Sequence, residues 1–145
     1  MASKQWTVLV VEDSADSVLL LERAVERANI AVSLQIVGNG AEGVDYLLGR
    51  GDYGDRDRYP LPILILSNMR MPRMNGLEFL AWIKQQPNFS RIPVIVLSSA
   101  GEIEEVDRVM ALGATAHFIK PFRLQDLVET IRQIQAFLPP SDSYT

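Results

Sequence analysis

The chain contains no cysteine and a single histidine among its 145 residues. The absence of cysteine excludes a disulfide framework and metal sites built from thiolates, and one histidine excludes a histidine-based metal cluster. No apolar run approaches the roughly 18 residues that a membrane span requires. The first residues, MASKQW, lack the apolar segment of a secretory signal. We therefore expect a cytoplasmic protein without a membrane segment.

Clustered positive charge is also lacking. The 14 Lys and Arg residues are outnumbered by 18 Asp and Glu residues, which gives a net charge of −4. Because nucleic-acid binding depends on concentrated Lys and Arg, we expect no nucleic-acid partner. A chain of this length, 48% hydrophobic, fits one domain. We place its core at about residues 6–138 and expect the tail at 139–145, rich in Pro and Ser, to be disordered.

Five short apolar runs rich in β-branched residues alternate with segments of helical spacing. The runs are continuously apolar rather than alternating, which is typical of a parallel sheet covered on both faces. They lie at residues 6–11, 33–37, 63–66, 92–97 and 116–119. This pattern predicts a doubly wound α/β sheet with right-handed crossovers. The functional site of such a sheet lies at the carboxyl ends of its strands.

Charged residues follow two of these runs. Glu12 and Asp13 come directly after the first, where paired carboxylates can bind a hard divalent cation; alternatively, one of them caps the next helix. Lys120 follows the fifth run. A cis Lys120–Pro121 bond would turn its ammonium toward the acids or toward a phosphoryl oxygen. The alternative is a surface lysine before a proline that starts a helix.

Polar residues occupy three further positions at the ends of the runs. The hydroxyl of Ser98 could donate to a phosphoryl oxygen or cap a helix beginning near Glu102. We expect the ring of His117 to be half-buried on an edge strand rather than to bind metal. Asn68 ends the third run. The charged segment before that run, GRGDYGDRDRYP at 49–60, is either a functional loop or a solvated excursion.

Taken together, several motifs resemble the receiver domain of response regulators over about residues 6–138. They are VEDS at 11–14, NMRMPRMNG at 68–76, VLSSA at 96–100, ALGA at 111–114 and FIKPF at 118–122. The resemblance implies a flavodoxin-like (βα)5 fold with strand order 2-1-3-4-5. It places Glu12, Asp13 and the backbone carbonyl of Arg70 at the metal site. It also places Ser98 on the switch hydroxyl, His117 on the rotating aromatic residue and Lys120 on the phosphate-contacting lysine.

The departure from the family lies at Asn68, which falls on the phosphoacceptor aspartate. A carboxylate can attack phosphorus, whereas a carboxamide is uncharged and far less nucleophilic. The pocket also loses one of its three acids, so Mg²⁺ should bind weakly or not at all. Ser67 cannot substitute, because successive strand residues face opposite sides of a sheet. Met71-Pro72 should begin a turn that Asn75-Gly76 closes.

The long segment before the third run and the stretch FLAWIKQQPNFSRIPVIVLSSA resemble the small regulators of cyanobacterial phytochrome kinases. The resemblance implies a stand-alone, non-enzymatic receiver in phosphorelay signalling that works by protein binding. Its partners would be a histidine kinase, with a phytochrome as the candidate, and a second copy of itself. The alternative is an ordinary phosphoacceptor receiver in which Asp was changed to Asn at position 68. Related phosphatases need an aspartate there, and flavin-binding relatives need a hydroxyl- and glycine-rich loop where this chain has EDSADS.

The expected homodimer would use the fourth helix, fifth strand and fifth helix, roughly Glu102 to Leu138. The fifth strand is predicted to be a sheet edge without charge before Lys120, and edges are normally covered or charged. The apolar pair Phe137-Leu138 at the end of the last helix would form an exposed interface patch. Alternatively, this pair packs back onto its own core.

Overall fold

The computed structural model describes residues 6–70 and 73–138, with Ala100 and Ile103 by their backbone alone. The strands are β1 (Trp6–Val11), β2 (Val32–Val37), β3 (Leu64–Asn68), β4 (Val94–Ser98) and β5 (Ala116–Ile119). The α-helices are α1 (Ala15–Ala28), α2 (Gly40–Leu48), α3 (Gly76–Lys84), α4 (Val106–Ala111) and α5 (Leu124–Ile134). Short 3-10 turns are η1 (Gly51–Gly54), η2 (Ala100–Glu105) and η3 (Gln135–Phe137). The predicted tail at 139–145 and the start of the turn at Met71-Pro72 lie outside the described residues.

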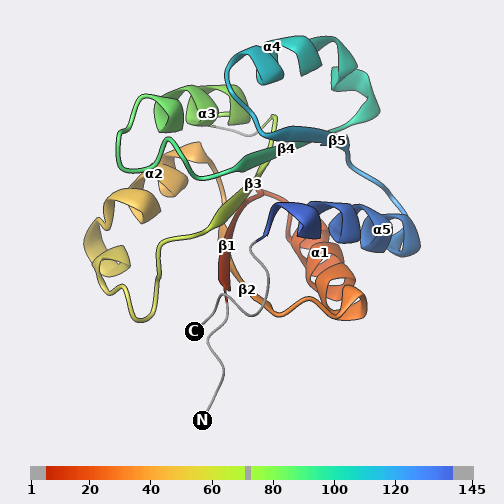
Figure 1. Ribbon diagram of the computed structural model, residues 1–145, viewed down its shortest axis with the longest axis horizontal. Coiled ribbons are helices and arrows are strands. Elements are labelled where there is room, and N and C mark those ends of the chain that lie inside the picture. Colours follow the sequence, from red (N-terminus) through yellow and green to blue (C-terminus); the bar gives the residue numbers. More distant parts are fainter. Residues whose placement is uncertain (1–5, 71–72, 139–145) are drawn as a thin grey trace.

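The strands form one parallel sheet in the order β2-β1-β3-β4-β5. This confirms the predicted flavodoxin-like fold. Helices α1 and α5 cover one face of the sheet, and α2, α3 and α4 cover the other (Figure 1). The order reverses between β1 and β3, so the carboxyl ends of these two central strands meet at the switch point of the topology.

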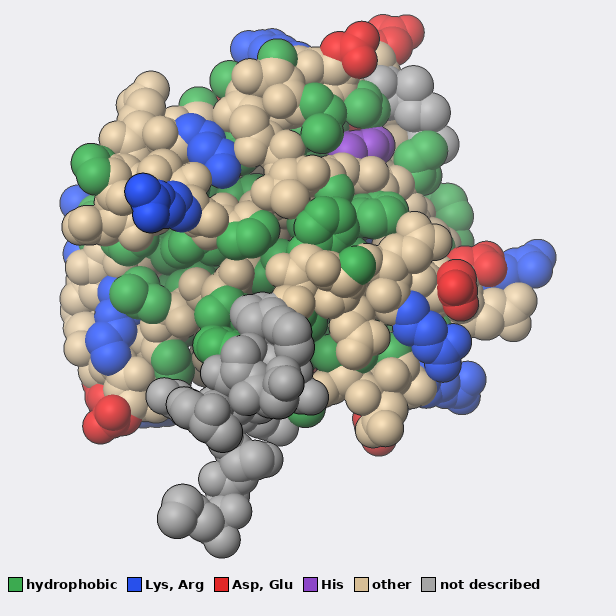
Figure 2. Space-filling view, viewed as in Figure 1, with side chains coloured by type: hydrophobic (Ala, Val, Ile, Leu, Met, Phe, Trp, Pro, Cys, Tyr) green, Lys and Arg blue, Asp and Glu red, His purple; other side chains and the backbone are tan. Residues whose placement is uncertain are grey.

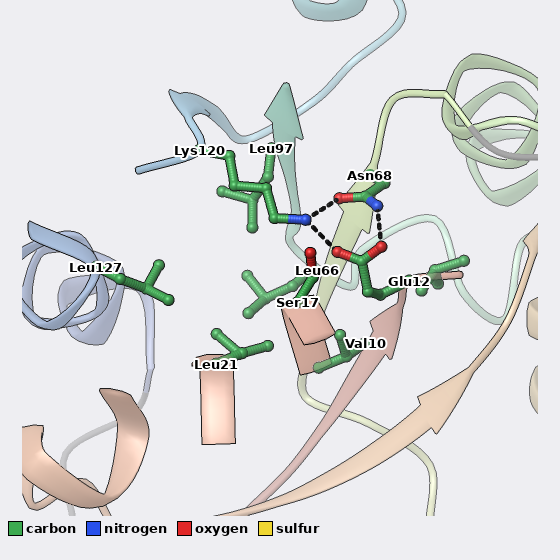
Figure 3. A pocket seen from close by; sticks show the side chains of 10 residues that line it. Val10, Glu12, Ser17, Leu21, Leu66, Asn68, Leu97, Lys120 and Leu127 are labelled. Atoms are coloured by element: carbon green, nitrogen blue, oxygen red, sulfur yellow. Dashed lines mark hydrogen bonds and ion pairs between the residues drawn. The ribbon is translucent and has the colours of Figure 1, made fainter. Parts of the chain in front are cut away.

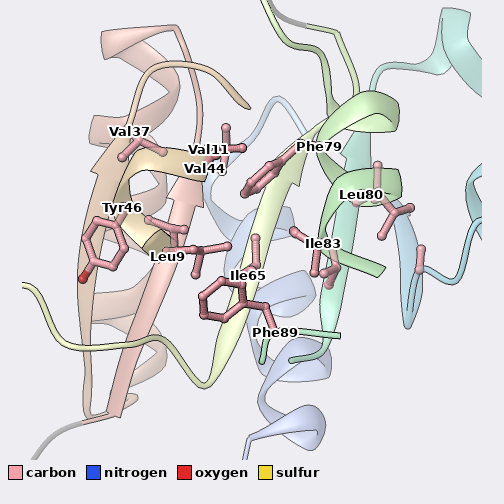
Figure 4. Close-up of a cluster of buried hydrophobic side chains, with 14 of the residues drawn as sticks. Leu9, Val11, Val37, Val44, Tyr46, Ile65, Phe79, Leu80, Ile83 and Phe89 are labelled. Carbon is pink, nitrogen blue, oxygen red and sulfur yellow. The ribbon is translucent and has the colours of Figure 1, made fainter. Parts of the chain in front are cut away.

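The core consists of two apolar layers, one on each face of the sheet. Leu9 and Ile65 pack with Phe79 and Ile83 under α2 and α3 (Figure 4). Their neighbours in sequence, such as Val8 and Leu64, pack on the other face against α1 and α5. Because side chains alternate along a strand, a strand that is buried on both faces must be apolar at nearly every position. This explains the continuous apolar runs in the sequence.

The three helices that follow β1, β2 and β3 begin at side-chain caps. Ser14 accepts from the amide of Ser17 at 3.3 Å, as predicted, and Asn39 caps α2. Asn75 and Glu78 form a reciprocal capping box at the start of α3. A Cβ at Gly76 would lie 2.1 Å from the carbonyl oxygen of Asn68. Glycine at position 76 therefore lets α3 start directly against the end of β3.

Two predicted boundaries shift for local reasons. Strand β4 begins at Val94 rather than Ile92, because Pro93 has no N–H to donate; its carbonyl accepts from Ile65 at 2.9 Å instead. The fourth helix does not begin near Glu102, because that residue lies in the 3-10 turn η2. The Ser99 amide donates to Glu102 Oε1 at 2.7 Å, and the Glu102 amide donates back to the Ser99 carbonyl at 3.0 Å. These bonds tighten the segment into i→i+3 geometry before α4.

The segment at residues 49–60 is largely exposed, but three of its side chains, Tyr53, Arg56 and Tyr59, anchor it against α2. The rings of Tyr46, Tyr53 and Tyr59 form a cluster with centroid distances of 5.0 to 6.1 Å. The Arg56 guanidinium donates to the carbonyl oxygens of Tyr46 (2.9 Å), Leu47 (2.8 Å) and Tyr59 (3.1 Å). Arg56 thereby satisfies carbonyls at the end of α2 and fixes the path of the segment.

Candidate functional site

Three polar side chains meet at the carboxyl edge of the sheet (Figure 3). Glu12 directly follows β1, Asn68 is the last residue of β3, and Lys120 directly follows β5. Lys120 Nζ forms an ion pair with Glu12 Oε1 and lies 3.5 Å from Asn68 Oδ1. Asn68 Nδ2 donates to Glu12 Oε2. The structure thus joins the three residues into a closed network, hereafter the pocket network.

The pocket network is largely shielded from solvent. The Glu12 side chain is 6% exposed and the Lys120 side chain 27% exposed. Apolar side chains of Leu21, Leu66 and Leu127 line the small cavity beside them (Figure 3). Glu12 Oε2 also accepts from the Ser14 amide at 3.1 Å. Both carboxylate oxygens therefore have partners, as a buried charge requires.

The adjacent acids of the sequence separate in the structure. Glu12 is buried, whereas Asp13 is exposed and makes no hydrogen bond or ion pair among the described residues. Ser14, rather than either acid, caps α1. Within residues 6–70 and 73–138, no group of three His, Cys, Asp or Glu side chains is placed to hold a metal ion. Of the two acids predicted to bind metal, Glu12 therefore contacts Asn68 and Lys120, and Asp13 takes no part in these contacts.

Lys120 reaches the pocket through a trans peptide bond. The described part of the chain contains no cis peptide, so the cis Lys120–Pro121 bond considered in the sequence analysis is absent. The alternative of a free surface lysine is also wrong, because the ammonium is paired with Glu12.

Ser98 and His117 lie on the neighbouring strands β4 and β5, and their side chains are hydrogen-bonded through Ser98 Oγ and His117 Nε2. Ser98 is buried and does not cap the following turn; Ser99 makes the contacts with Glu102 instead. The half-buried ring predicted at position 117 is confirmed. Desolvation lowers the pKa of His117, although the nearby charge of Glu102 opposes this effect. The neutral imidazole is therefore favoured.

The side chain of Arg70 bridges the loop after β3 to the turn after β4. Its Nε lies 2.8 Å from Glu102 Oε2, and its guanidinium also pairs with Glu105. Sequence reasoning assigned Arg70 a role through its backbone carbonyl and missed these ion pairs. The available signal was the acidic stretch GEIEEVD after the fourth run. Arg70, Ser99 and Glu102 line a cavity of about 140 Å³ that extends to Asn68 and Lys120.

Positive charge is dispersed over the face of the molecule shown in Figure 2. Lys and Arg side chains form small separate groups there, interspersed with acidic ones, and the ring of the single histidine reaches the surface. No helix in the described part of the chain has the length and apolar character needed to cross a bilayer.

The fold and the site at its strand ends define the class of this protein. Residues 8–132 match the family model described as the response regulator receiver domain. The chain belongs to this family.

Within the family, the chain is similar to response regulators of phytochrome and red-light signalling. It is 32% identical over 130 residues to response regulator Rcp1 of Synechocystis sp., covering 90% of this chain and 86% of Rcp1. The crystal structure of RPA3017, in red light signaling of R. palustris, superposes with a TM-score of 0.86 at 31% identity, covering 94% and 95% of the two chains. The structure of phosphorylated RcpA, a cyanobacterial phytochrome response regulator, superposes with a TM-score of 0.82 at 28% identity, covering 92% of this chain and 94% of RcpA. The structure of the Mn²⁺-bound form of Rcp1 superposes with a TM-score of 0.79 at 30% identity, covering 93% of this chain and 99% of the Rcp1 chain.

Proposed function

We propose that this chain is a non-enzymatic receiver of phosphorelay signalling that does not accept phosphate at Asn68 and acts by binding other proteins. The observation that carries the proposal is the position of Asn68, whose amide contacts both Glu12 and Lys120 at the end of β3. A carboxamide there is a poor nucleophile. Ser67 offers no replacement, because it is buried and its hydroxyl donates to the Asn68 carbonyl at 2.9 Å.

A phosphoryl-transfer assay tests this proposal. With Mg²⁺ and a small acyl-phosphate donor, the chain should gain no acid-stable, hydroxylamine-labile phosphate, whereas Asn68→Asp should become labelled. Asn88→Asp is the matched control, because it makes the same chemical change at an exposed position outside the site. Labelling of the unaltered chain would overturn the proposal. An unlabelled Asn68→Asp variant would show that more than the acceptor has been lost.

A histidine kinase of the phytochrome class is the proposed partner, on the strength of the similarity to RcpA and RPA3017, and the proposed compartment is the cytoplasm. Phe122, two residues after Lys120, would provide an apolar anchor, because this residue is 91% exposed. Exposed aromatic side chains that become buried in complexes often dominate binding energy. Phe122→Ala should weaken kinase binding, as measured by calorimetry. Leu61→Ala, at another exposed apolar position, should not.

A homodimer through α4, β5 and α5 is the second proposed interaction, with one change from the sequence expectation. Phe137 and Leu138 are half-buried and pack against the core layer under α1 and α5, so they do not form an exposed patch. Met110 on α4 and Ile119 on β5 are exposed apolar residues of this face, and the exposed Phe122 follows in the loop before α5. Among the described strands, β5 pairs with β4 alone and leaves its other edge open.

Sedimentation velocity at micromolar concentrations tests the dimer. Ile119→Glu should shift the association to at least about tenfold higher concentration, corresponding to about 1.4 kcal/mol. Leu48→Glu on α2 is the control, because Leu48 is also an exposed apolar residue but lies outside this face. A monomer at all concentrations would contradict the dimer, and equal weakening by both variants would move the interface elsewhere.

A further inference from the structure

We infer that the side-chain amide of Asn68 takes the place of a divalent cation, so that the pocket is neutralised by the chain itself and its folded state does not depend on metal. The inference deepens the proposed function and rests on the role assigned there to position 68. It concerns stability and conformation rather than phosphoryl transfer, so the two can be tested separately.

The pocket network is balanced in charge, and both carboxylate oxygens of Glu12 accept hydrogen bonds. It contains one carboxylate, Glu12, and one ammonium, Lys120, in direct contact. The second oxygen of Glu12 accepts from Asn68 Nδ2 and from the Ser14 amide. A divalent ion ligated by this oxygen would have to displace these donors. Asp13, the acid nearest in sequence, is exposed and takes no part in the network.

The two ends of the Asn68 amide have opposite functions. Nδ2 donates to Glu12, and Oδ1 faces Lys120 at 3.5 Å. A carboxylate at position 68 has acceptors alone. The oxygen that replaced Nδ2 would face Glu12 Oε2 with no proton between them, and the pocket would hold two carboxylates against the single ammonium of Lys120. Replacing one NH₂ group by oxygen therefore converts a neutral pocket into one with an excess negative charge, which a bound cation would offset.

The amide also has a mechanical effect. Through Glu12 and Lys120 it connects the carboxyl ends of β1 and β3 with the segment after β5. The ends of β1 and β3 are also where the resemblance to receiver domains places the metal residues. With the connection made by side chains, the ends of the three strands keep one arrangement whether or not an ion is present.

Thermal unfolding of the full chain in EDTA and in millimolar Mg²⁺ tests the inference. The unaltered chain should show the same Tm in both, within about 1 °C. Asn68→Asp should unfold about 5 °C lower in EDTA and recover most of this loss in Mg²⁺. Asn68→Leu, which removes both amide contacts without adding charge, should have a lower Tm than the unaltered chain, and Mg²⁺ should not change that Tm. Asn88→Asp serves as the control for an added carboxylate at an exposed site.

Two results would overturn the inference: a Tm of the unaltered chain that rises with Mg²⁺ as much as that of Asn68→Asp, or an Asn68→Asp variant as stable as the unaltered chain in EDTA. The labelling assay separates this failure from that of the proposed function. A chain that responds to Mg²⁺ but is not labelled keeps the proposed function and loses the inference. If the unaltered chain is labelled and its Tm does not change with Mg²⁺, the inference stands and the proposed function is wrong.

Discussion

Two partly buried cations, Lys120 and Arg56, hold two different regions of this receiver together. Lys120 binds side chains, namely the carboxylate of Glu12 and the amide of Asn68. Arg56 binds three backbone carbonyl oxygens and lies over the ring of Tyr46, 5.8 Å from its centroid. Both positions fix a segment against the rest of the fold, but their partners differ in kind.

The contacts of Lys120 depend on which side chains occupy the partner positions, whereas the contacts of Arg56 depend on the path of the backbone. The carbonyls that Arg56 binds are present whatever side chains the chain carries there, and a cation at the end of α2 also suits the helix dipole. The partners of Lys120 exist only while positions 12 and 68 keep their side chains. A change at either position alters the state of the pocket, whereas the 49–60 segment tolerates changes to neighbouring side chains.

The largest expected effect is at Lys120. Lys120→Met should lower the free energy of unfolding by about 3 kcal/mol, because it leaves the buried carboxylate of Glu12 without its cation. Adding Glu12→Gln should restore most of this loss, since both charges are then absent. Urea denaturation measures both values. A double variant as unstable as the sum of its two single variants would contradict the assigned coupling.

A smaller loss of unfolding free energy is expected when Arg56 is replaced, and no second side-chain change should compensate for it. Arg56→Ala should cost about 2 kcal/mol, because three carbonyls lose a charged donor. Arg56→Lys should recover only part, since an ammonium cannot reproduce the fork of a guanidinium. Arg50→Ala is the control: its ion pair with Asp45 is exposed and should contribute less than about 0.5 kcal/mol. A full rescue by lysine would contradict the geometric argument.

The smallest expected effects are changes of stability with pH. Tyr46, beside the 49–60 segment, should act at alkaline pH, and His117, on β5, should act at mildly acidic pH. Burial raises the pKa of Tyr46 to about 12, and its hydroxyl donates to the Pro60 carbonyl at 2.7 Å. Ionisation of the unfolded chain should therefore remove stability as the pH rises from about 10 to 12. The lowered pKa of His117 means that the unfolded chain binds its proton first, so stability falls as the pH drops below about 6.5.

Unfolding temperatures measured across the pH range test both directions. Tyr46→Phe should reduce the alkaline loss of stability, to which the raised pKa of Tyr53 also contributes, and leave the acid loss unchanged. His117→Asn should flatten the acid loss alone, and the chain has no second histidine to confuse the result. If Tyr46→Phe changed the acid loss of stability, or His117→Asn changed the alkaline loss, that loss could not be due to the residue named for it.

The apolar runs predicted a doubly wound parallel sheet and the meeting of Glu12, Asn68 and Lys120, because parallel strands bring their carboxyl ends to one edge. The strand order was implied by the resemblance to receiver domains. Sequence reasoning could not predict that Asp13 lies outside the pocket. Adjacent residues leave a strand end in different directions, and which of two similar acids is buried depends on partners distant in sequence.

Contacts between side chains of separate elements were also beyond sequence reasoning. The ion pairs of Arg70 join two loops, and the Ser98–His117 bond joins two strands; each requires particular side-chain rotamers. The burial of Phe137 had a similar cause, since the space under α5 depends on how α1 packs against it. Local periodicity contains no information about such distances.

The separations in sequence within the pocket network have a consequence for folding kinetics. Its bonds connect residues 52, 56 and 108 positions apart, whereas the bonds of Arg56 and Tyr46 connect residues 3 to 14 positions apart. Closing the longer loops costs more chain entropy and needs most of the sheet in place. We therefore expect the contacts of the 49–60 segment to form early and the pocket network last. Substitutions in the network should then speed unfolding more than they slow folding. The pocket would thus govern the lifetime of the folded receiver as well as the chemistry at its strand ends.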